Sequence, residues 1–197
     1  MCRIAQVVLL LLVFCRISVA EEVLPVVSVD GEIFAKKFVG TPPNGDKLLE
    51  FVRDSESFDN WTKLIGYRYQ QLPGLENDPI KYAVFLGQMV KQANPQANFQ
   101  IIRNKQSDEA IIDFLTWPQD QKFMELNVFR LWKSTDGKAV VSLQIAYRFS
   151  VPTPVTTRES GNDVERKRNE LRERRQLWIK HAAESDVKAI EMTLLRQ

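Results

Sequence analysis

The sequence predicts an α+β fold: a mostly antiparallel sheet is covered by helices, and a long helix ends the chain. Three observations predict it. Strand-like stretches run through residues 99–150, an amphipathic helix pattern precedes them, and a second one ends the chain. Of the 197 residues, 44% are hydrophobic and 26% charged, a globular composition that excludes collagen-like and disordered chains.

The first twenty residues have the pattern of a secretory leader. Arg3 supplies a basic start, residues 7–14 are an unbroken apolar run, and Ser18-Val19-Ala20 is a small-x-small triplet. This order is typical of a signal peptide, residues 1–20, that is cleaved after Ala20. The apolar run is shorter than the about 20 residues of a membrane-spanning helix. We therefore expect a periplasmic or secreted protein without a stable membrane span; the alternative is an uncleaved anchor.

Cleavage of this leader changes both the charge balance and the cysteine count. Lys and Arg fall from 27 to 25 and then equal the 25 Asp and Glu, so no basic field favours a nucleic-acid partner. Cys2 and Cys15 also leave with the leader. The exported chain would then have no disulfide, no thiol nucleophile and no thiolate metal ligand.

The globular domain, residues 21–150, begins with short strands. Residues 26–29 and 33–39 are β-prone and flank Asp30-Gly31, a two-residue hairpin turn. Residues 47–54 predict a third short strand. The first part of the domain is therefore expected to be β-structure.

Two segments then have the apolar spacing of helices. Residues 58–65 carry Phe, Trp, Leu and Ile at helical spacing, with Ser57 in front as the N-cap. A second helix is predicted after Asp78 as the N-cap, with Pro79 in the first helical position, and it ends at Asn94-Pro95.

Two antiparallel hairpins complete the domain. Residues 99–103 and 110–117 flank a polar turn, and residues 123–132 and 139–149 flank Asp136-Gly137. In the last strand apolar residues alternate with Ser, Gln and Arg. This alternation predicts one covered face and one wetter face.

A Pro/Thr-rich linker, residues 151–161, leads to a C-terminal helix at residues 162–197. Asn162 is its expected N-cap, with Glu165 at capping-box spacing. Residues 163–175 are densely charged, so this part is expected to project into water or to reach a partner. An apolar stripe in the second half predicts docking on the domain; it consists of Ile179, Ala183, Val187, Ile190 and Leu194.

Two neighbouring segments suggest a family. Glu50-Phe51-Val52-Arg53 leads to Ser57-Phe58-Asp59-Asn60-Trp61-Thr62, and in PsbP-like chains a similar strand is followed by a polar turn and a Trp-containing helix. With the element order of residues 26–150, this resembles the PsbP-type fold of lumenal photosystem accessory proteins and related nuclear-transport cofactors, and the resemblance implies an α/β/α sandwich. The resemblance implies an assembly or binding role rather than catalysis, although fold alone does not carry function.

No motif for catalysis, metal or cofactor binding is complete. His181 is the only histidine and cannot build a histidine-rich zinc site, and the eight glycines form no phosphate-binding loop. We therefore predict a non-enzymatic protein without a cofactor or metal. The alternative is a carboxylate-dependent hydrolase, for which Asp113 and Glu125 are the candidate pair because they are charges within strands.

Arginines and lysines in the first half of the C-terminal helix are interleaved with glutamates. This spacing favours intrahelical ion pairs on a solvated face, and contact with a partner is the alternative. Two tryptophans are candidate interface anchors, although core packing is their commoner role. The candidate partner-binding residues are Arg168, Arg172, Arg175, Trp178 and Trp132.

These patterns predict an exported binding or assembly-accessory protein of a bacterial cell envelope, acting through the sheet edge or the charged helix. Its partner is expected to be a protein rather than a nucleic acid. A secreted effector or toxin component is a further alternative. The sequence specifies neither the partner nor the oligomeric state.

Overall fold

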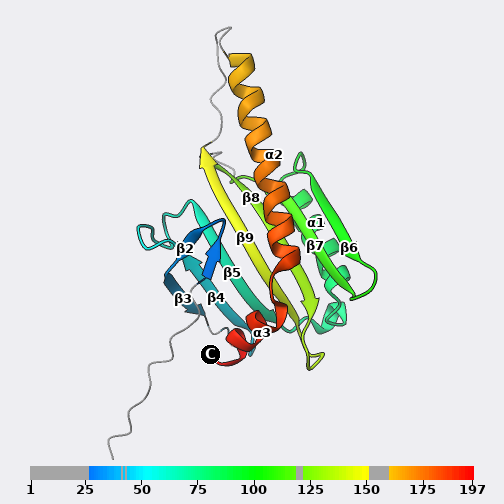
Figure 1. The fold of residues 1–197 in the computed structure, drawn as a ribbon. Helices are drawn as coiled ribbons and strands as arrows, with labels where there is room; N and C mark the ends of the chain where they lie inside the picture. Colours follow the sequence, from blue (N-terminus) through cyan, green and yellow to red (C-terminus); the bar gives the residue numbers. More distant parts are fainter. Residues whose placement is uncertain (1–26, 41, 43, 119–121, 151–159) are drawn as a thin grey trace, which may run out of the picture.

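The computed structural model describes residues 27–40, 42, 44–118, 122–150 and 160–197, the first three of the last range by their backbone alone. They form one seven-stranded antiparallel sheet with helices on both faces, and a separate two-stranded hairpin (Figure 1). The elements are β1 (Val27–Val29), β2 (Glu32–Phe34), β3 (Lys36–Gly40), β4 (Lys47–Val52), β5 (Lys63–Gln70), η1 (Pro73–Leu75), α1 (Pro79–Ala93), β6 (Phe99–Asn104), β7 (Glu109–Thr116), β8 (Phe123–Lys133), β9 (Val140–Ser150), α2 (Ser160–Glu184) and α3 (Val187–Leu195). The predicted α+β class, with a large antiparallel sheet and a C-terminal helix, is confirmed.

The sheet is built from two blocks of strands. Its order is β3-β4-β5-β9-β8-β7-β6, so β3–β5 form one half and β6–β9 the other, joined where β5 pairs with β9. α1 carries the chain from β5 to the far edge of the sheet. This arrangement leaves β3 and β6 as the two edge strands.

The two faces of the sheet are covered by different elements. On one face Tyr82 and Ala83 of α1 pack with Phe114 of β7. On the other face α2, α3 and the β1–β2 hairpin enclose the main core, which includes Trp178 and Leu194. In Figure 1 α2 crosses in front of the sheet and α1 lies behind it. The described residues therefore form three layers.

Several predicted elements are confirmed with their local causes. Asp78 caps α1, since its carboxylate accepts the backbone N–H of Ile80 at 2.7 Å and of Lys81 at 3.0 Å. Both C-terminal hairpins pair as expected. The Asp30-Gly31 turn joins β1 to β2, with positive φ at both residues, 54° and 75°. The predicted strand over residues 33–39 divides, because β2 pairs with β1 whereas β3 joins the large sheet.

The helix predicted over residues 58–65 is wrong, because β5 begins at Lys63. Leu64 and Ile65 are both buried but belong to different core clusters, as neighbours in a strand between two covered faces should. Trp61 precedes the strand and packs with Leu64 and Val52. The apolar residues at helical spacing thus belong partly to the loop before β5 and partly to β5 itself, and they meet because the loop packs against the strand.

The C-terminal helix differs from the expectation in three ways. α2 begins at Ser160, inside the predicted linker, so Asn162 lies within the helix instead of capping it. The remainder of the linker lies outside the described residues, as does the predicted leader. Asp186 then starts a second helix, α3, by accepting the N–H groups of Lys188 and Ala189. The apolar stripe also differs from the predicted one, because Ala182 of α2 is buried and Ala183 is exposed.

The loop between β4 and β5 is held by one carboxylate. Glu56 accepts hydrogen bonds from the Arg53 guanidinium at 2.6 Å and from the Thr62 backbone N–H at 2.8 Å. Burial raises the pKa of Glu56, but the hydrogen bonds from Arg53 and Thr62 outweigh it and lower the pKa to about 2. The ionised carboxylate therefore stabilises the loop.

This depressed pKa predicts a pH-dependent contribution to stability. It is fully present above the ordinary pKa of 4.5 and is lost as the pH falls toward about 2, because the unfolded chain binds the proton more readily. We expect Glu56→Gln to lower the free energy of unfolding at neutral pH by about 1–3 kcal/mol and to flatten its acid dependence. Urea denaturation across this range tests it, with the exposed Asp54→Asn as control; equal acid dependence of wild type and Glu56→Gln would contradict it.

Candidate functional site

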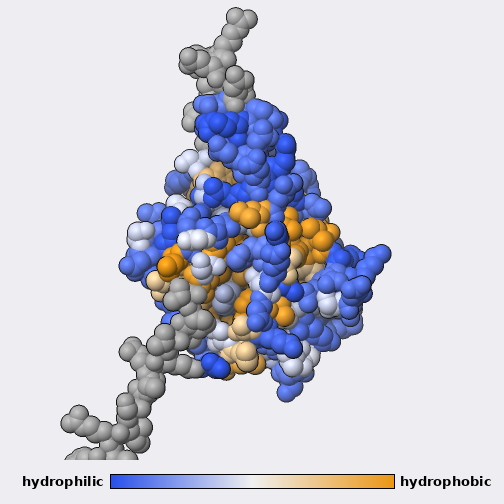
Figure 2. All heavy atoms as spheres, in the orientation of Figure 1, coloured by the Kyte–Doolittle hydropathy of each residue, from blue (hydrophilic) through white to orange (hydrophobic). Residues whose placement is uncertain are grey.

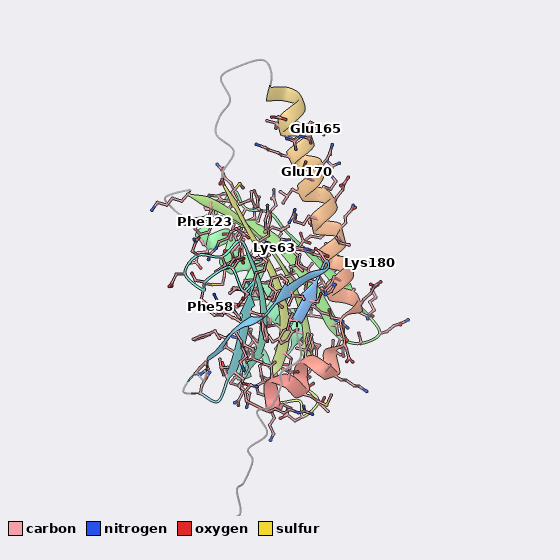
Figure 3. All side chains as sticks on the ribbon, turned by 60° about the vertical axis from the view of Figure 1, so that its left-hand side comes forward. Phe58, Lys63, Phe123, Glu165, Glu170 and Lys180 are labelled. Carbon is pink, nitrogen blue, oxygen red and sulfur yellow. The ribbon has the colours of Figure 1, made fainter. Side chains whose placement is uncertain are left out.

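α2 crosses one face of the sheet and extends beyond the ends of the strands. Its first half projects past the strands, where Figure 3 shows Glu165 and Glu170, and Lys180 lies farther along the helix. The surface of the projecting part is hydrophilic (Figure 2). Ion pairs three and four residues apart, such as Arg166 with Glu170 at 2.7 Å, confirm the predicted intrahelical pairing.

Two polar contacts fix the second half of α2 on the sheet. The Arg175 guanidinium pairs with Asp113 of β7, with 2.8 Å between Nη2 and Oδ2. Arg130 of β8 donates to the carbonyl groups at the C-terminal end of α2, to Ala182 at 3.0 Å and Ser185 at 2.9 Å. A cation at a helix C-terminus satisfies carbonyls that have no partner within the helix. The position of α2 is therefore well defined.

A groove of about 420 Å³ lies between this helix and strands β6 and β7. Leucines from three elements give it an apolar floor, and arginines of α2 form one wall. Figure 2 shows hydrophobic surface beside α2, over β7 and β6. We call it the basic groove; its lining residues are Asn98, Phe99, Gln100, Asp113, Phe114, Leu115, Leu126, Arg168, Leu171, Arg172 and Arg175.

Three of the five predicted partner-binding residues line the basic groove: Arg168, Arg172 and Arg175. They differ in whether a carboxylate neutralises their charge. Arg175 is neutralised by Asp113, which is buried, and also donates to Gln100. Arg168 pairs with Glu165 at 3.3 Å, with both side chains more than half exposed. Arg172 makes no ion pair with any residue that the structure describes. The groove therefore offers positive charge next to apolar surface.

The two predicted tryptophan anchors lie elsewhere. Trp178 is 1% exposed and Trp132 is 4% exposed, and both belong to the main core. The Trp178 indole N–H donates to Asp30, which ties α2 to the β1–β2 turn. Because neither ring reaches the surface, their place among the partner-binding residues is corrected to the core.

The candidate catalytic carboxylates do not converge. Asp113 points toward α2 and is paired with Arg175. Glu125 accepts from Arg148 at 2.9 Å and from Asn127 at 2.9 Å, on the opposite face of the sheet. Each carboxylate is engaged by an arginine, and no substrate could lie between the two.

The prediction of a wetter face on β9 is wrong, because two polar residues of β9 on the face that bears Glu125 are buried. Ser142 is 1% exposed and Gln144 is 8% exposed. Gln144 accepts from Arg68 at 3.0 Å and donates to Asn127 at 2.7 Å, so a chain of hydrogen bonds crosses β5, β9 and β8. Gln144 is thus satisfied by neighbouring side chains in place of water, whereas the buried Ser142 hydroxyl has no hydrogen-bond partner among the described residues.

A second cleft, of about 430 Å³, lies between the β1–β2 hairpin and the α2–α3 junction, and it includes His181. Its polar groups serve the fold: Ser185 donates to the carbonyl of His181 and Asp186 caps α3. Burial raises the pKa of Tyr67 in its wall to about 12. In the described ranges no three His, Cys, Asp or Glu side chains are grouped to hold a metal ion.

Sequence reasoning found the arginines of the basic groove but missed its other wall. The sequence singled out Asp113 only as half of a candidate catalytic pair, and no motif marked Leu115 or Leu126. The one available signal was that Asp113 interrupts an otherwise apolar strand, since a charge there requires a partner.

Comparisons with known proteins identify a family. Within the described part of the chain, no helix is long and apolar enough to cross a membrane. No curated protein and no solved structure matches the chain. One protein-family model matches residues 23–187, which is most of the sequence. The chain belongs to the family that this model represents.

Proposed function

We propose that the protein is an exported, non-enzymatic binding or assembly-accessory protein of the bacterial cell envelope, and that the basic groove is where it holds a protein partner. The observation that supports this most is Arg172, which forms no ion pair with any described carboxylate and lines the groove beside the apolar floor formed by Leu115 and Leu126. Positive rims with apolar centres are typical of surfaces that bind proteins.

The arrangement of the groove supports binding over catalysis. Its one carboxylate, Asp113, is held by Arg175, so it has no free base to offer. A rigid helix and two paired strands form the walls, and a pre-formed site of this kind lowers the entropic cost of binding. The leader predicted over residues 1–20 and the PsbP-like resemblance favour an accessory role in the envelope.

We expect the groove to account for capture of a partner from envelope fractions. Arg168→Glu/Arg172→Glu should weaken the interaction at least about tenfold, or ~1.4 kcal/mol, because it reverses the charge of the rim. The matched control is Arg166→Glu/Lys180→Glu, which makes the same charge change at exposed positions of α2 outside the groove. Pull-down with the mature chain and each variant measures the effect.

Point variants are preferable to removing the helix, since deletion of α2 and α3 would also take Trp178 and Leu194 out of the core. If the groove variant captures the same proteins as the control, the groove is not the binding site. If Asp113→Ala or Glu125→Ala abolishes turnover of a substrate while the fold is retained, the protein is a hydrolase and the binding proposal is wrong.

A further inference from the structure

The two edges of the large sheet differ in how they are protected. β3, with the sequence KKFVG, begins with two lysines, and Lys36 donates across to the carbonyl of Glu56. β6, with the sequence FQIIRN, has no proline and a single charge, Arg103. Charged residues and prolines are the usual devices that stop an edge strand from pairing with another chain. β6 is thus the less protected edge, and no described strand pairs with its outer side.

β6 is also held rigidly from behind. It pairs with β7 along its whole length, from Phe99 opposite Phe114 to Asn104 opposite Glu109. α1 packs so closely on it that a Cβ added at Gly87 would lie 2.6 Å from the Phe99 ring. A strand that is fixed in this way presents its free N–H and C=O groups in the geometry that a further strand requires.

The basic groove begins at this same edge. Gln100 of β6 lines it and accepts a hydrogen bond from Arg175, and Arg172 follows on the same wall. A strand added about 4.8 Å outside β6 would turn alternate side chains toward α2 and the others toward the face that α1 covers. The first set would meet arginines, and the second would lie beside Ile101, which packs against the α1 core.

We infer that the free edge of β6 binds an extended segment of a partner protein in which acidic and apolar residues alternate, and that this segment becomes an eighth strand of the sheet. The inference rests on the proposed function, because the same groove supplies the charge that selects the segment. Backbone pairing would provide much of the affinity, and the arginines would provide specificity.

Charge complementarity separates this occupant from a second copy of the chain. Two paired β6 strands would bring two basic edges together, each with Arg103 and beside its own basic groove, and β6 has no acidic side chain to balance them. Like charges across a strand pair are destabilising. An acidic segment would neutralise the same groups.

The experiment uses hydrogen exchange of the mature chain, followed by NMR, with a peptide of about eight alternating glutamate and valine residues as the probe. Amides on the outer side of β6 are expected to exchange fast in the free protein, because no described strand accepts from them. Saturating peptide should slow them about tenfold or more, because they become donors to the added strand. A peptide with lysine in place of every glutamate is the matched control and should give no protection.

Each other outcome overturns the inference. Binding of the glutamate peptide without protection of β6 would exclude strand pairing, while capture through the groove would still stand. Absence of binding, or equal protection by the lysine peptide, would exclude an acidic strand. If β6 amides are already protected in the free protein in a concentration-dependent way, a second copy occupies the edge.

Discussion

Trp178→Ala should lower the free energy of unfolding by about 3–5 kcal/mol, since it leaves a large cavity in the main core. The indole is 1% exposed and packs edge-on against Tyr147, with ring centroids 6.0 Å apart. Its N–H also anchors α2 to Asp30 of the hairpin turn. The substitution therefore removes packing and a tie between two elements at once.

Urea denaturation measures this loss, and the neighbouring residue supplies the control. Leu177 is 50% exposed, so Leu177→Ala should change the free energy of unfolding by no more than about 0.5 kcal/mol. Equal effects of the two substitutions would mean that α2 does not dock through Trp178.

Arg130→Met should lower the free energy of unfolding by about 3 kcal/mol, because it leaves a mostly buried carboxylate without its ion-pair partner and the C-terminal carbonyls of α2 without a donor. Glu109 lies 2.7 Å from the Arg130 guanidinium and its side chain is 17% exposed. The same guanidinium holds the last carbonyls of α2, including that of Ala183 at 2.9 Å. No other described side chain donates to these carbonyls.

A second substitution separates the two contributions. Arg130→Met/Glu109→Leu should recover part of the loss, since it removes the stranded charge but leaves the helix end uncapped. Arg166→Met, at an exposed ion pair, should have an effect below about 0.5 kcal/mol in the same denaturation series. A full recovery in the double variant would show that the cap contributes nothing.

The elements with strong local signals were predictable. α1 has its cap at Asp78 and a proline in the first turn, and the hairpins have their turns marked by Asp30-Gly31 and Asp136-Gly137. Such signals depend on a few neighbouring residues, so they survive in the folded chain. Pairing of β5 with β9 could not be predicted, because strand order depends on contacts between distant residues.

The errors have a common cause, which is that one-dimensional spacing does not show what covers a residue. Trp61 and Leu64 share a face of the structure through a loop rather than a helix. Asp186 shortens the final helix because its carboxylate can cap a new one. In both cases the tertiary structure uses a local alternative that the periodicity alone does not reveal.

The candidate site was half predictable for the same reason. The arginines of α2 stand close together in sequence, so their clustering was visible. The Arg175–Asp113 pair joins residues 62 positions apart, and it is one of the contacts that fix α2 over β7 and so form the groove. The sequence indicated the charged helix that forms one wall of the basic groove. The apolar floor beside that wall depends on the fold.

Site-specific photo-crosslinking in intact cells tests most directly whether the basic groove is the contact surface. A photoreactive residue is placed at Asn98, which is exposed and lines the groove, or at Gln88, which is exposed on α1 at the other face. We expect a discrete crosslinked envelope protein from position 98 and none from position 88. Crosslinking from position 88 alone, or from neither position, would contradict the account.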